Sequence, residues 1–185
     1  MTRLDPVDPT TATGTARTLL DTVQSKLGRI PNMMRTMALS PAVLEGYLGL
    51  NIALAGGVLT ARLREQIALT VAEANRCGYC LAAHTYFGKR AGLDADALDQ
   101  ARQASASDPK AAAALTFVRT IVEQHGAISD EELRRVREAG YEEGEIAEMV
   151  AHVALNIFTN YLNLVAQTEV DFPPVELHLG VRRAA

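Results

Sequence analysis

The chain has 185 residues, of which 48% are hydrophobic and 22% are charged, and this balance excludes wholesale disorder and suits one domain with a buried core. Its 18 lysines and arginines stand against 22 aspartates and glutamates with no basic cluster, so nucleic acid is not an expected partner. Only 5% of the residues are aromatic, while alanine and leucine are abundant, and this favours helices over a β-sandwich or barrel.

The apolar spacing and the placement of proline and glycine predict a succession of helices. Residues 1–12 hold two prolines and no apolar period, so we expect an extended arm there. The predicted helices then cover about 15–28, 31–38, 41–55, 60–74, 94–102, 110–125, 129–139 and 142–168, with a further helix beginning near residue 77. Thr60 is a favourable N-cap, and Ser129 with Glu132 is typical of a capping box. Residues 172–185 are expected to form a loosely held tail.

No run of alternating β-branched residues is long enough for a strand, so the sequence predicts an all-α single domain over 1–185. The first six residues contain acid and proline where a signal peptide needs an apolar stretch, and we expect a cytoplasmic protein. The most apolar segment, 150–166, is interrupted by four polar residues and falls short of a membrane span. In such a compartment cysteines remain thiols unless they are placed for redox chemistry.

The two cysteines of the chain lie close together, in Cys77-Gly78-Tyr79-Cys80, with His84 four residues further on. On a helix that begins near Cys77, both sulfurs and the imidazole lie on one face. The unpaired N–H groups and the dipole at a helix start lower the pKa of a cysteine, and an imidazole one turn along can accept its proton. The pattern predicts an activated thiol pair; a zinc site and inert core thiols are the alternatives.

Other polar residues lie at helical spacing from this pair or on another helix. Glu65 and Glu73 both precede the cysteines and are candidates for orienting the imidazole or relaying its proton. Glu73 has Arg76 as a ready partner and is more simply interpreted as a surface carboxylate. A polar stripe on an apolar helix predicts a hydrogen-bonded seam or a subunit contact, with a pocket wall near the thiols as the alternative. The residues of this stripe are His152, Asn156, Asn160 and Asn163.

The chain carries Leu-Arg-Glu at 63–65 and Cys-Gly-Tyr-Cys-Leu-Ala-Ala-His at 77–84. With the apolar helix between them, these segments resemble the core of the alkylhydroperoxidase AhpD-like proteins of the carboxymuconolactone decarboxylase superfamily, over about 60–92. Residues 156–160 and 171–173 are similar to the peroxidase-related branch of that superfamily. The resemblance implies an all-α fold of paired antiparallel helices, assembly into a homotrimer or homohexamer, and a dithiol peroxidase or disulfide reductase activity.

The resemblance also implies roles for particular residues. Cys80 attacks the peroxide, Cys77 resolves the sulfenic acid into a disulfide, and Glu65 with His84 forms a proton relay. Tyr79 stands where AhpD itself has a histidine, and we expect a simpler relay because a phenol is not a base at neutral pH. No metal and no built-in cofactor is implied, and the electrons come from an external dithiol such as a lipoyl domain or a thioredoxin-like protein. The candidate pocket residues are Tyr79, Asn156 and Asn160.

Two other classes of function stay open. One is a non-redox enzyme of the same superfamily, such as a lactone decarboxylase that uses His84 as its base, although those enzymes generally lack the cysteine pair. The other is a helical oligomerisation module whose thiols are incidental. For the oxidoreductase, the expected partners are a peroxide or disulfide substrate and the external dithiol, with neither nucleic acid nor membrane.

Overall fold

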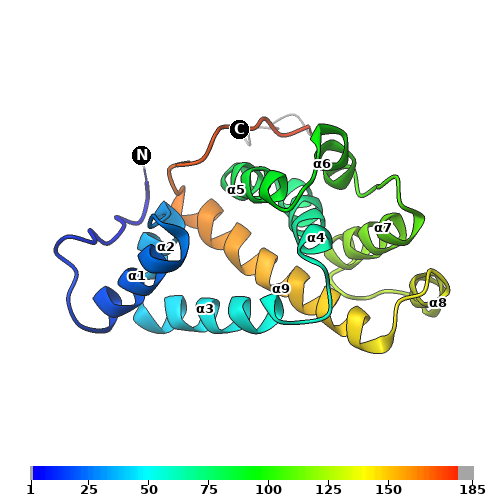
Figure 1. The fold of residues 1–185 in the computed structure, drawn as a ribbon, viewed down its shortest axis with the longest axis horizontal. Coiled ribbons are helices and arrows are strands. Elements are labelled where there is room, and N and C mark those ends of the chain that lie inside the picture. Colours follow the sequence, from blue (N-terminus) through cyan, green and yellow to red (C-terminus); the bar gives the residue numbers. More distant parts are fainter. Residues whose placement is uncertain (1, 179–185) are drawn as a thin grey trace.

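The computed structural model describes residues 2–178, and residues 1 and 179–185 lie outside the described part of the chain. Within this part the secondary structure is helical and contains no strand, so the all-α prediction is confirmed (Figure 1). The helices are α1 (Gly14–Leu27), α2 (Asn32–Met37), α3 (Pro41–Ala55), α4 (Ala61–Ala74), α5 (Gly78–Arg90), α6 (Ala95–Arg102), α7 (Pro109–Glu123), α8 (Asp130–Glu138) and α9 (Glu143–Ala166).

Local sequence signals fix where these helices begin and end. The Thr60 hydroxyl accepts a hydrogen bond from the backbone N–H of Leu63 and caps α4. Ser129 and Glu132 form the predicted capping box at the start of α8. Gly28 follows α1 with a φ of 72°, a left-handed conformation that favours glycine. The predicted helix ranges therefore agree with the observed ones to within a few residues.

The chain breaks between α4 and α5, and the site depends on this break. α4 ends at Ala74, Arg76 adopts a φ of 56°, and α5 begins at Gly78 with Cys77 as its N-cap. A continuous helix would have used the N–H groups after Cys77 for its own hydrogen bonds. The break leaves them available to the Cys77 sulfur, which accepts the N–H of Cys80. The prediction of a helix that begins near Cys77 is confirmed.

α4 and α9 form the centre of the fold. α4 packs against α5, α6, α7 and α9, and its side chains from Ile67 to Ala72 lie in the core. α9 lies between α3 on one side and α4 with α5 on the other (Figure 1). α9 is long and apolar enough to cross a membrane, but half of its most apolar window is buried inside the fold. Its contacts on both sides are those of a core helix.

The N-terminal arm is non-helical up to Thr13, as predicted, and hydrogen bonds hold it to the rest of the fold at two points, Arg3 and Val7. The Arg3 N–H donates to the carbonyl of Ala166 at 2.7 Å. Further along, the Val7 N–H donates to the carbonyl of Arg35 at 3.1 Å, and the Arg35 side chain returns a bond to the Val7 carbonyl at 3.0 Å. These bonds fasten the arm to α2 and to the end of α9.

The expectation of a loose tail from residue 172 is wrong for its described part. Phe172 is only 7% exposed, and its ring packs against the rings of Tyr79 and Phe87. The His178 N–H donates to a Glu73 carboxylate oxygen at 2.7 Å. The aromatic side chain and this buried acceptor draw the segment onto α4 and α5, while residues 179–185 lie outside the described residues.

Candidate active site

The N-terminus of α5 holds the two thiols together. The Sγ of Cys77 accepts a hydrogen bond from the backbone N–H of Cys80 at 3.3 Å. Both cysteines are free thiols, and they are 1% and 2% exposed. Cys80 lines a cavity of about 210 Å³, whereas Cys77 lies beneath it and is not one of the lining residues. The sulfurs therefore adjoin each other at a helix start, and one of them faces the cavity.

The two sulfurs have opposite pKa shifts. Burial alone raises the pKa of Cys80, but a hydrogen bond from the Cys77 thiol, the charge of His84 and the amides of Asn163 and Asn160 outweigh it and lower the pKa to about 7. The Asn163 amide donates to the Cys80 sulfur at 3.3 Å. The pKa of Cys77 is raised, because its proton is shared with Cys80 and because burial disfavours its charge. Of the two thiols, Cys80 is therefore the one that ionises near neutral pH.

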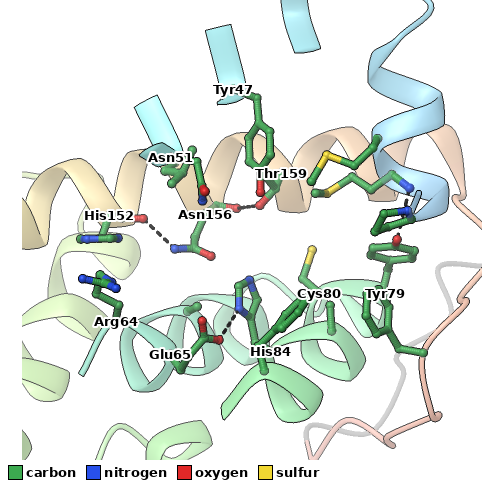
Figure 2. Close-up of a pocket in the computed structure, with 18 of the residues that line it drawn as sticks. Tyr47, Asn51, Arg64, Glu65, Tyr79, Cys80, His84, His152, Asn156 and Thr159 are labelled. Carbon is green, nitrogen blue, oxygen red and sulfur yellow. Dashed lines mark hydrogen bonds and ion pairs between the residues drawn. The ribbon is translucent and has the colours of Figure 1, made fainter. Parts of the chain in front are cut away.

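Glu65 of α4 and His84 of α5 form an ion pair beside this thiolate. The Glu65 carboxylate accepts a hydrogen bond from Nδ1 of His84 at 2.8 Å, and the imidazole lies between Glu65 and Cys80 (Figure 2). Burial lowers the pKa of His84, but the Glu65 carboxylate and the Cys80 thiolate raise it above its usual value. Because Nδ1 is held by the carboxylate, the other ring nitrogen remains for a proton transfer in the cavity.

Glu73, the other candidate carboxylate, lies elsewhere. It is 1% exposed, pairs with Nε of Arg102 at 2.9 Å and is not among the residues that line the cavity. The interpretation of Glu73 as a surface carboxylate beside Arg76 is therefore wrong. The sequence alone did not show that α6 would bring Arg102 over the end of α4.

Tyr79 forms part of the cavity wall and lies apart from Glu65 and His84 (Figure 2). Its hydroxyl donates to the Asp171 carboxylate at 2.8 Å and accepts from the Met33 N–H at 3.2 Å. Both sides of the phenol oxygen are therefore occupied by the tail and by α2. Tyr79 therefore joins the segment at Asp171 and helix α2 to α5.

The polar stripe of α9 contributes both to the wall of the cavity and to a hydrogen-bonded contact between helices. His152 and Asn156 line the cavity, as the pocket-wall alternative proposed. Asn160 is not a lining residue, so its prediction as a pocket residue is wrong. It accepts a hydrogen bond from the Asn75 amide at 3.0 Å, as expected for a helix–helix seam, and it lies beside Cys80. The bond from Asn163 to the Cys80 sulfur was missed, because helical spacing shows which residues share a face but not what packs against it.

Most of the residues of the cavity wall could not be predicted from the sequence, because they belong to elements far from the cysteines in the chain. The missed lining residues are polar ones from α3 and α4, apolar ones from α2, and one aromatic residue of the tail. They include Met33, Met34, Tyr47, Asn51, Arg64 and Phe172. Nothing local in α2 or α3 marks these residues as neighbours of a thiol.

The described residues do not provide the set of ligands that the alternative of a zinc site requires. Zinc sites in proteins use four ligands, or three and a water molecule, that converge on one point. In the part of the chain that the structure describes, no three histidine, cysteine, aspartate or glutamate side chains converge in this way. The candidate trio of Cys77, Cys80 and His84 therefore has the spacing of metal ligands without their geometry.

Comparison with known proteins supports the expected family. Residues 41–123 match the carboxymuconolactone decarboxylase family, a range that holds α3, α4 and both thiols. The match covers 83 of the 185 residues, and over that range the chain is similar to this family. The resemblance stated for 60–92 is thereby confirmed, and the matched range extends it to α3, α6 and α7. A comparison with curated protein sequences gives no significant match.

Solved structures share the fold of this chain at low sequence identity. One is the alkylhydroperoxidase AhpD core of an uncharacterized peroxidase-related protein from Ralstonia eutropha JMP134, with a TM-score of 0.83, 22% identity and 92% of each chain covered. An uncharacterized peroxidase-related protein from Silicibacter sp. TM1040 has a TM-score of 0.77 and 20% identity, over 97% of this chain and 98% of that one. These likenesses establish the AhpD-like fold.

A third similar structure is the debrominase Bmp8. It has a TM-score of 0.78 and 20% identity, and 92% of each chain is covered. That structure is of a cysteine-to-alanine variant in complex with 2,3,4-tribromopyrrole. The AhpD-like fold is thus shared by proteins whose names denote different chemistries, so function has to be inferred from the site.

Proposed function

We propose that this chain is a thiol-dependent oxidoreductase that reduces a peroxide by cycling a disulfide between Cys77 and Cys80. The observation that carries the proposal is the position of Cys80, whose sulfur faces the cavity with a pKa of about 7. A thiolate is the reactive form of cysteine, and here a second thiol lies within hydrogen-bond reach of it. Those are the two requirements of a dithiol cycle.

The reaction proceeds in two steps. The Cys80 thiolate attacks the outer oxygen of ROOH, the O–O bond breaks, and the alkoxide takes a proton and leaves as ROH. Cys80 is oxidised to a sulfenic acid in this step. The Cys77 sulfur then attacks the Cys80 sulfur, an S–S bond forms, and hydroxide takes the Cys77 proton and leaves as water. One peroxide and two thiols give one alcohol, one water and one disulfide.

In this proposal Glu65 and His84 supply the proton that the alkoxide needs. The imidazole lies beside Cys80, and the carboxylate on Nδ1 favours its protonated form. His84 as a cation also stabilises the thiolate before the attack. An external dithiol, of the lipoyl or thioredoxin-like kind that the family resemblance implies, returns two electrons and regenerates the thiols.

Reductive debromination is a second candidate, and the likeness to Bmp8 favours it. The same dithiol could supply its two electrons: an aryl bromide and two thiols would give the arene, bromide, a proton and a disulfide. Peroxide and 2,3,4-tribromopyrrole are therefore the two oxidants to compare. The lactone decarboxylase and the oligomerisation module predict no disulfide with either compound.

The test is a mass measurement of the tryptic peptide 77–89, which holds both cysteines. After peroxide, the peptide should lose two hydrogens, and an added dithiol should restore its mass. Cys80→Ser should abolish peroxide turnover, and Cys77→Ser should retain a trapped sulfenic acid on Cys80. Unchanged turnover in Cys80→Ser, or full activity after alkylation of both thiols, would contradict the proposal.

Self-association is a further part of the proposal, and the surface supports it. Large apolar side chains on α3, on the loop after it and on α9 are exposed, and contacts between subunits would remove them from water. These side chains include Leu50, Ile52, Val58, Val150, Phe158, Tyr161 and Val165. We expect light scattering to give a homotrimer or homohexamer, and a monomer at micromolar concentration would contradict it.

A further inference from the structure

The cavity has a second polar end, away from the thiols. Arg64 and His152 lie on the far side of the Glu65–His84 pair from Cys80, and Asn51 of α3 lies near them (Figure 2). All of these side chains line the same cavity as Cys80. A ligand that contacts Cys80 can therefore extend along the cavity to Arg64 and His152.

Arg64 keeps donors available at this end. Its Nη1 donates to the carbonyls of Ala55 at 3.1 Å and Leu59 at 2.8 Å, which hold the side chain in place. No carboxylate of residues 2–178 forms an ion pair with it, and its Nε and Nη2 have no hydrogen-bond partner there. The guanidinium is thus oriented by two backbone bonds and still has two donors for a ligand.

The two carboxylates nearest to this end are already engaged. Glu148 accepts hydrogen bonds from the backbone N–H groups of Val58 at 2.9 Å and Leu59 at 3.1 Å. Glu65 accepts the hydrogen bond of His84 at 2.8 Å. Neither carboxylate forms a hydrogen bond or an ion pair with the guanidinium in the described residues, so Arg64 can receive an anionic group from a ligand.

His152 supports the same interpretation independently. The side chain is only 6% exposed, and its Nε2 is buried with no hydrogen-bond partner in the described residues. Burial and the charge of Arg64 lower its pKa, which Glu148 and Glu65 raise more weakly, so the ring is neutral at pH 7. A buried nitrogen without a partner is destabilising, and a ligand oxygen in the cavity would remove this penalty.

We propose that the cavity binds a small organic acid, seated with its carboxylate on Arg64 and His152 and its reactive group on Cys80. Within the proposed function, the substrate is then a hydroperoxide that also carries a carboxylate. An arginine fork matches a carboxylate better than it matches any neutral group. The volume of about 210 Å³ equals the liquid volume of roughly seven waters, which suits a compact acid.

The test measures occupancy of the cavity and does not need turnover. Reduced protein is alkylated with iodoacetamide at pH 7, and the rate at Cys80 is followed on peptide 77–89 by mass spectrometry. The competitors are 3-phenylpropanoate and 3-phenylpropanamide, which have nearly the same shape and differ in charge. The acid should protect Cys80 at a concentration about tenfold or more below the amide, as expected for a charged hydrogen bond.

Two variants assign the preference to a residue. Arg64→Gln should remove the difference between acid and amide, and Arg62→Gln should keep it. Arg62 is the matched control because it lies on the same helix, donates to the Gly92 carbonyl and does not line this cavity. Equal protection by the two compounds in the unaltered protein would overturn the proposal, whether or not Arg64→Gln folds. A preference for the acid that persists in folded Arg64→Gln would overturn it as well.

The test of acid binding at Arg64 can fail or succeed independently of the test of the dithiol cycle. Hydrogen peroxide carries no carboxylate, so disulfide formation with hydrogen peroxide tests the dithiol cycle alone. Protection by the acid tests the Arg64 end alone. For the substrate itself, 4-carboxycumene hydroperoxide should have a KM about tenfold or more below that of its methyl ester. Equal KM values would overturn the assignment of the carboxylate to the substrate.

Discussion

Glu65 and Glu73 lie eight residues apart on α4, and each pairs with a cation from a neighbouring helix. Glu65 meets His84 in the cavity, and about a quarter of each side chain is exposed. Glu73 meets Arg102 beneath the tail, where it also accepts the N–H of His178. The same helix thus places one glutamate in the cavity, Glu65, and another in the core, Glu73.

The difference between the two pairs lies in the partner and in access to a ligand. An imidazole changes its charge near neutral pH, whereas a guanidinium remains charged. The pair with His84 can therefore move a proton, and the pair with Arg102 can only hold segments together. A buried carboxylate on a central helix is evidence of function only when its partner can titrate and when the cavity reaches it.

The largest expected effect is on stability, at the core end of α4. Glu73→Gln leaves Arg102 without its carboxylate, and we expect the free energy of unfolding to fall by about 3–5 kcal/mol in urea. Glu138→Gln, which breaks an exposed pair with Arg134, should cost less than about 1 kcal/mol at the same protein concentration. Similar losses in the two variants would remove the distinction between the ends of α4.

Glu65→Gln, unlike Glu73→Gln, should lower peroxide turnover and leave stability nearly unchanged. We expect peroxide turnover to fall by about a hundredfold, because the proton transfer by His84 loses its orienting carboxylate. The free energy of unfolding should change by no more than about 1 kcal/mol, since the pair is partly exposed. Stopped-flow kinetics and urea unfolding measure the two quantities on the same preparation. Unaltered turnover in the variant would exclude Glu65 from the relay.

A smaller effect is expected at the thiolate itself. With a pKa of about 7, Cys80 should be protonated and slow to react below this pH and ionised above it, so its alkylation rate should rise through pH 7. Asn163→Ala removes a donor to the sulfur and should move this midpoint up by about one unit. Asn156→Ala is the control, since its amide donates to the His152 carbonyl instead of to sulfur. An unmoved midpoint in Asn163→Ala would contradict the assignment.

The smallest effect is expected at Tyr79. Tyr79→Phe loses the bonds to Asp171 and to the Met33 N–H while it keeps the ring against Phe172. We expect a loss of about 1 kcal/mol in unfolding free energy and unchanged peroxide turnover. A tenfold loss of turnover would show that this phenol belongs to the relay with His84 after all.

The sequence could predict the helices and the thiol pair because both depend on local geometry. Caps such as Thr60 and the box at Ser129 act within one turn. Cys77, Cys80 and His84 share a face by their spacing alone. The pairing of Glu65 with His84 joins two helices; the position in the chain made both Glu65 and Glu73 candidates for it, and the family resemblance singled out Glu65.

Burial and long-range contacts could not be predicted in the same way. The sequence alone determined a set of helices and two sulfurs at the start of one of them, since hydrogen bonds and dipoles there act over a few residues. Only the tertiary structure decided that Cys80 faces the cavity, that Asn163 donates to it and that Glu73 is buried. These facts depend on how α9, α6 and the tail pack on α4 and α5, and solvent exclusion by distant segments sets both the pKa values and the shape of the cavity.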